Sequence, residues 1–107
     1  MPPPGLVAFD VQPDGSLKNE RQFSTCVCND GTAVDAQGRI YSTGGQGVQV
    51  LDKNGKYIGE IPAPLNLITV AFGGKDKKTL YGIANNQQFD EIFTIPMLAQ
   101  GYKGRPK

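Results

Sequence analysis

The sequence has no histidine, only two cysteines and no long hydrophobic run. Because a thiolate metal site needs more ligands than Cys26 and Cys28 can supply, we interpret both as small, half-buried side chains in a reducing compartment. No apolar stretch approaches the ~20 residues that a membrane-spanning helix requires. Eleven basic and ten acidic residues give a net charge of +1, so we expect neither nucleic acid nor an anionic membrane as a partner.

The start of the chain does not resemble a secretory signal. The proline-rich segment 1–5 has no basic region followed by an apolar stretch, which is the pattern of a secretory signal. At the other end we expect a solvated basic tail, at 105–107. The missing signal and the reduced thiols together predict a cytoplasmic location.

Glycine and proline are abundant. Fourteen glycines and eight prolines are too many for a helical bundle of this size, and short strands joined by turns rich in these residues are typical of an all-β fold. The sequence also repeats itself, because 35–41 is echoed by 73–81, and 7–15 by 48–55. A period of roughly 40 residues lies in the range of one four-stranded propeller blade.

Alternating apolar residues and turn signals predict nine short strands. Their expected bounds are 7–11, 17–23, 32–35, 39–43, 48–51, 56–61, 68–72, 79–83 and 92–95. They group as two, four and three strands, which is one complete blade flanked by two incomplete ones. Because only a closed ring removes exposed strand edges, we expect the chain to be marginal as a monomer and to self-associate through its free edges.

Four motifs connect these elements with a known family. They are Phe9 to Leu17, Asp30 to Tyr41, Gly47 to Val50 and Ala71 to Tyr81. Over residues 6–104 the chain resembles the C-terminal part of the gluconolactonase family, also called the senescence marker protein or regucalcin family. We therefore assign 6–104 to a partial β-propeller, between the N-terminal segment 1–5 and the basic tail.

The resemblance implies a six-bladed β-propeller that hydrolyses sugar lactones and related esters with a divalent metal at its central channel. The implied ligands are a glutamate, an asparagine and an aspartate in an Asp-Gly step, and only the last has a counterpart here, in Asp30. By the same resemblance Asp30 is the catalytic base. The implied metal of the full-length parent is Ca²⁺ or Zn²⁺, with Mn²⁺ or Mg²⁺ as further candidates.

One carboxylate does not make a divalent metal site, since hard cations need several oxygen ligands. We therefore expect this chain to be a fragment of a lactonase-type hydrolase that is inactive by itself, with the activity belonging to the parent. The alternatives are a non-catalytic truncated propeller that acts as an interaction or self-assembling module, and an inert product of a partial gene.

Taken alone, Asp30-Gly31 is a turn, in which the aspartate caps the backbone and the glycine supplies a positive φ. We interpret Asp10, Asp35 and Asp52 as further turn formers, and Asn85-Asn86 as part of a loop. Aromatic residues at strand positions are expected to pack between blades: Phe9, Tyr41, Phe72, Tyr81 and Phe93.

Overall fold

The structure is a computed structural model, in which residues 5–25, 31–44, 47–63, 67–85 and 90–102 are described. These residues form nine strands, and they contain no helix able to cross a membrane. The strands are β1 (Leu6–Val11), β2 (Leu17–Ser24), β3 (Thr32–Val34), β4 (Ile40–Gly44), β5 (Gly47–Leu51), β6 (Tyr57–Pro62), β7 (Leu67–Gly73), β8 (Thr79–Asn85) and β9 (Asp90–Pro96). Each overlaps one predicted strand and agrees with it to within two residues at either end.

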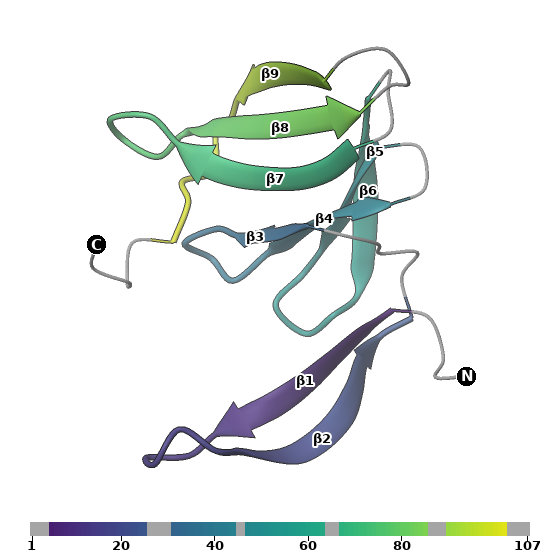
Figure 1. Cartoon of the computed structure of the whole chain (residues 1–107), viewed down its shortest axis with the longest axis vertical. Helices are drawn as coiled ribbons and strands as arrows, with labels where there is room; N and C mark the ends of the chain where they lie inside the picture. Colours follow the sequence, from purple (N-terminus) through teal and green to yellow (C-terminus); the bar gives the residue numbers. More distant parts are fainter. Residues whose placement is uncertain (1–4, 26–30, 45–46, 64–66, 86–89, 103–107) are drawn as a thin grey trace.

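The strands pair into three antiparallel sheets, ordered β1-β2, β3-β4-β5-β6 and β7-β8-β9. This confirms the all-β fold and the predicted grouping of two, four and three strands. The sheets follow one another across the molecule in sequence order, with the four-stranded sheet in the middle (Figure 1). The first strands of the second and third sheets, β3 and β7, lie beside each other, as the inner strands of successive blades do.

The hydrophobic core lies between the four-stranded and the three-stranded sheet. Its buried members are Tyr41, Val48, Val70 and Leu80. The ring of Tyr41 on β4 meets that of Phe72 on β7 edge to face, with 5.2 Å between centroids and 84° between planes. Burial of this apolar surface is the main force that holds the two sheets together.

The expected packing of aromatic rings between blades is confirmed for Tyr41 and Phe72. The rings of Tyr81 and Phe93 lie over glycines of their own sheet, because a residue without a side chain leaves room for a ring on the neighbouring strand. Phe9 is 39% exposed on β1. For these three residues, packing between blades stays a prediction.

Two aspartates form hairpin turns of the same design. Oδ1 of Asp35 accepts hydrogen bonds from the backbone N–H groups two and four residues ahead, and Oδ1 of Asp52 does the same. Gly38 and Gly55 complete these turns with φ of +84° and +88°. Both predicted turn formers are therefore confirmed.

The turn assignment of Asp10 is wrong. Asp10 lies inside β1, where its carboxylate accepts a hydrogen bond from the Asn19 amide (2.8 Å) and pairs with Arg21 (3.1 Å). The turn that follows β1 uses Asp14, whose carboxylate accepts the N–H and the hydroxyl of Ser16. The Asp14-Gly15 step is the turn signal here, whereas the spacing of five residues from Asp10 to Gly15 misled the assignment of Asp10.

Asp35 differs from Asp52 because it is also buried, with 1% of its surface exposed. Its Oδ2 accepts hydrogen bonds from Arg39 Nε (2.7 Å) and from the Tyr41 hydroxyl (2.8 Å). Burial raises the pKa of Asp35, but these bonds and those from the turn outweigh it, so the pKa lies below its ordinary value of 3.8. The carboxylate therefore stays ionised in the fold and fixes the tyrosine that packs against β7.

Residues 97–102, here called the C-terminal strap, tie the second sheet to the third. On one side Met97 N–H donates to the Lys78 carbonyl (2.8 Å) and Gly101 N–H to the Lys77 carbonyl (2.8 Å). On the other side Ala36 N–H donates to the Gln100 carbonyl, and Tyr102 N–H to the Val34 carbonyl. The strap thus bridges the β3–β4 turn and the β7–β8 turn at one end of the sheets.

We predict that Asp35→Ala lowers the free energy of unfolding by about 2–4 kcal/mol, because it leaves the Tyr41 hydroxyl and Arg39 without their acceptor. Asp52→Ala is the matched control. It removes the same two turn hydrogen bonds at an exposed site, where water replaces them, and should cost clearly less. Urea denaturation followed by circular dichroism measures both, and equal losses would contradict the role of the buried Oδ2 contacts.

Candidate functional site

The predicted site residue Asp30 lies outside the described residues, as do Cys26, Cys28 and Asn86. The residue that follows it, Gly31, and the strand that it enters, β3, are described. The site is therefore described from the backbone that directly follows Asp30.

That backbone is anchored on β4. Gly31 N–H donates to Thr43 Oγ1 (3.1 Å), and Thr43 N–H donates to the Gly31 carbonyl (3.0 Å). The same carbonyl accepts the Ser42 hydroxyl (3.4 Å). Ser42 and Thr43 are 1% and 0% exposed, so these bonds are shielded from competing water. The chain directly after Asp30 is thus held in one position.

Gly31 is required for a reason that differs from the expected one. Its φ is not in the left-handed region, so it supplies no positive φ to an Asp-Gly turn. Instead, a Cβ at this position would lie 2.5 Å from the Cα of Thr69 on β7. Only glycine lets β3 begin this close to the inner strand of the next sheet.

The polar side chains around Gly31 are hydroxyls. Thr32 donates to the Ser42 hydroxyl (3.3 Å), while Thr43 and Thr69 lie against Gly31 itself. Among the described residues no group of three or more His, Cys, Asp or Glu side chains could hold a metal ion. Since Ca²⁺ and similar hard ions are bound largely by carboxylate and amide oxygens, the described residues do not supply a ligand set.

The strand ends place Gly31 at one end of the sheets. The pairs Gly44–Gly47, Gly47–Pro62 and Asn85–Asp90 lie at this same end, whereas the β3–β4 turn and the C-terminal strap lie at the other. Figure 1 shows β3 and β7 running in the same direction, away from this end.

The prediction that Asn85 belongs to a loop is wrong, since it is the last residue of β8, where it pairs with Asp90.

A separate hollow of about 590 Å³ lies between the end of β2 and the β5–β6 hairpin. Phe23, Gln49 and Tyr57 are among the residues that line it, and no acidic side chain is among its described lining. Lys56 is the charged side chain of this described lining, whereas the general base of a hydrolysis is more often a histidine or a carboxylate. The hollow is therefore not the candidate site.

The hydroxyl anchor of Gly31 has a signal in the sequence. Ser42 and Thr43 are consecutive polar residues inside the second strand of a predicted four-stranded blade. Polar side chains on both faces of an interior strand need partners, and here the partner is the start of β3. The role of Thr69 had no such signal, because it depends on the approach of a second sheet.

Comparison with known proteins identifies the family to which the chain is similar. The sequence profile of the SMP-30/Gluconolactonase/LRE-like region matches residues 2–84. Lactonohydrolase oryH of Aspergillus oryzae (strain ATCC 42149 / RIB 40) is 36% identical over 79 residues, which are 71% of this chain and 17% of that protein.

Two solved structures share the fold. A structural-genomics target assigned to the gluconolactonases superimposes with a TM-score of 0.79 at 26% identity, covering 91% of this chain and 33% of its own. A gluconolactonase of Xanthomonas campestris superimposes with a TM-score of 0.65 at 31% identity, covering 74% of this chain and 27% of its own. The chain thus spans a third or less of the length of these relatives.

We predict that Gly31→Ala lowers the free energy of unfolding by about 1–3 kcal/mol, because the new methyl group would overlap the backbone of β7. Gly59→Ala on β6 is the matched control, since a Cβ there meets nothing within 4 Å. It should be close to neutral. Chemical denaturation of the two variants tests this, and a tolerated Gly31→Ala would show that β3 and β7 are farther apart.

Proposed function

The chain belongs to the SMP-30/gluconolactonase/LRE-like family, and we propose that it forms three consecutive sheets of a lactonase-type hydrolase. The parent protein would hydrolyse sugar lactones or related esters. In this reaction water adds to the acyl carbon, the acyl C–O bond breaks, and a hydroxy acid is released. The family and the names of its relatives support the reaction class.

The observation that carries the proposal is the anchored start of β3. Two buried hydroxyl residues, Ser42 and Thr43, fix the Gly31 backbone, and Thr69 of β7 closes against it. We propose that this platform fixes the chain that follows Asp30, and that the Asp30 carboxylate accepts a proton from the attacking water. Preorganised groups of this kind accelerate a reaction because they need no rearrangement in the transition state.

A divalent ion belongs to the proposal only for the complete parent. Asp30 would supply one oxygen ligand, whereas Ca²⁺ takes 6–8. The remaining ligands would have to come from outside this chain, because the described residues contain no further cluster of suitable side chains. We therefore assign this chain weak ion binding and no turnover of its own.

The isolated chain should show no hydrolysis of sugar lactones with Ca²⁺, Zn²⁺, Mn²⁺ or Mg²⁺, and should bind Ca²⁺ with a Kd of about 1 mM or weaker. Asp30→Asn should abolish this binding when it is measured by titration calorimetry. Asp14→Asn, at an exposed turn, is the control and should leave it unchanged. Turnover by the chain that is lost in Asp30→Ala would overturn the claim that the site is incomplete.

A second candidate function, self-assembly, is favoured by the β1–β2 pair. Four apolar side chains on it are exposed: Val7 (48%), Phe9 (39%), Val11 (73%) and Leu17 (57%). Within the described part of the chain, β1 pairs only with β2, and β9 only with β8, so each leaves one backbone edge open. Open edges with apolar side chains favour pairing with another strand.

If these edges drive assembly, sedimentation velocity should find small oligomers that increase with protein concentration. Val11→Lys should shift the protein toward monomer, because a charge on an edge strand opposes pairing. Leu98→Lys, at an exposed position outside the strands, is the control and should have no effect. A monomer at every concentration, or an equal effect of both substitutions, would remove this candidate.

A further inference from the structure

The β7–β8 turn and the C-terminal strap together form a basic surface with an apolar centre. The turn carries Lys75, Lys77 and Lys78, and the strap carries Leu98 and Tyr102. We call these five residues the basic patch. They are brought together by the strap, which bonds to the turn through its Met97 and Gly101 N–H groups and through the Gln100 side chain, which donates to the Asp76 carbonyl (2.7 Å).

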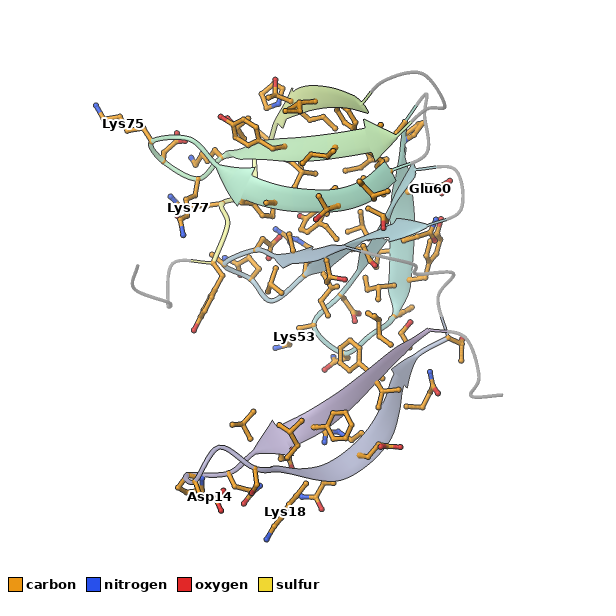
Figure 2. The ribbon with its side chains drawn as sticks, viewed as in Figure 1. Asp14, Lys18, Lys53, Glu60, Lys75 and Lys77 are labelled. Carbon is orange, nitrogen blue, oxygen red and sulfur yellow. The ribbon has the colours of Figure 1, made fainter. Side chains whose placement is uncertain are left out.

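The positive charge of the patch is not neutralised by neighbouring acids. Among the described residues, none of the three lysines forms a salt bridge. Lys77 Nζ instead donates to the Tyr102 carbonyl (3.3 Å), which connects the turn with the end of the strap. Of the acids near the patch, Asp76 uses Oδ1 to accept the Lys78 N–H. Asp35, whose backbone bridges Gly101 of the strap, pairs with Arg39. Figure 2 shows Lys75 and Lys77 at the same end of the molecule, with Glu60 at the opposite end.

Leu98 stands clear of the protein, with 100% of its surface exposed, and Tyr102 is 58% exposed. A single exposed leucine is common on protein surfaces. This one differs because the strap is hydrogen-bonded on both sides of it, at Met97 and Gly101, which fixes the backbone that carries the side chain. An exposed apolar side chain on a surface that also carries lysines and a tyrosine is typical of a surface that docks on a bilayer.

We propose that the basic patch binds the surface of a lipid bilayer that contains anionic headgroups. The lysine ammonium groups would contact the headgroups, Leu98 would enter the boundary with the acyl chains, and Tyr102 would lie at headgroup level. The net charge of +1, from which we expected no anionic membrane partner, conceals this uneven distribution of charge.

A bilayer explains the patch better than the other polyanions do. A protein partner would need a pocket shaped for the protruding Leu98, whereas the bilayer interface accommodates an apolar side chain without one. A nucleic acid would use the lysines but would gain nothing from the leucine. The patch also lies at the end of the sheets opposite to Gly31, so that docking there would leave the proposed site open to substrate.

The test is flotation of the purified chain with vesicles, since bound protein rises with the lipid and aggregated protein sinks. The chain should float with vesicles of phosphatidylcholine and phosphatidylserine, but not with phosphatidylcholine alone, and added salt should weaken the binding. Lys75→Gln/Lys78→Gln should lower the affinity about 25-fold, at about fivefold for each lysine. Leu98→Ser should lower it about fivefold to tenfold.

Two controls carry the same chemical changes elsewhere on the surface. Lys18→Gln/Lys56→Gln removes two exposed lysines, and Ile58→Ser on β6 removes an aliphatic side chain that is 52% exposed. Each should change the affinity less than about twofold. All four variants alter exposed side chains, so their far-ultraviolet circular dichroism should match that of the unaltered chain.

Several results would overturn the proposal. They are equal flotation with both kinds of vesicle, no flotation at all, or control variants that lose as much affinity as the patch variants. A further arm adds polyglutamate or a duplex DNA fragment as a competitor. If the competitor removes the chain from the vesicles, and if Leu98→Ser leaves the binding of the chain to that competitor unchanged, the patch binds an acidic protein or a nucleic acid instead.

Discussion

The buried carboxylate of Asp35 is the contact on which the arrangement of the sheets depends. One of its oxygens forms the β3–β4 turn, and the other holds Arg39 and the Tyr41 hydroxyl. Tyr41 in turn packs edge to face on Phe72 of the next sheet. A charge in this position is stable only because four hydrogen bonds replace its hydration, which is why its pKa lies below the ordinary value.

The two ends of the sheets have different chemistry. At one end, buried hydroxyls hold the Gly31 backbone, and the missing side chain of Gly31 allows β7 to approach. This is the fixed backbone that we propose positions a catalytic carboxylate. At the other end, the Asp35 turn and the C-terminal strap close the space between the sheets and display lysines and an exposed leucine. A propeller separates such ends because all its strands run between the same two faces.

Local rules were sufficient where a residue acts on its own neighbours. The Asp35 and Asp52 turns, the nine strands and their grouping follow from alternating apolar residues and from turn glycines, and all were confirmed. The same rules failed for Asp10, because its partners Asn19 and Arg21 lie across a hairpin. They also assigned the wrong role to Gly31. A side chain is excluded at this position by β7, a strand that begins 36 residues later at Leu67.

The sequence by itself thus determined the fold class, the strand order and the family, since these depend on periodic patterns and on motifs within one blade. Only the tertiary structure decided which side of the molecule each functional group occupies. It made Asp35 a core residue while Asp52 stayed at the surface, although both turns have the same local pattern. It also placed the lysines of one turn on the same surface as a leucine about twenty residues away, because the strap folds back between two sheets. No local sequence pattern indicates that the chain folds back there.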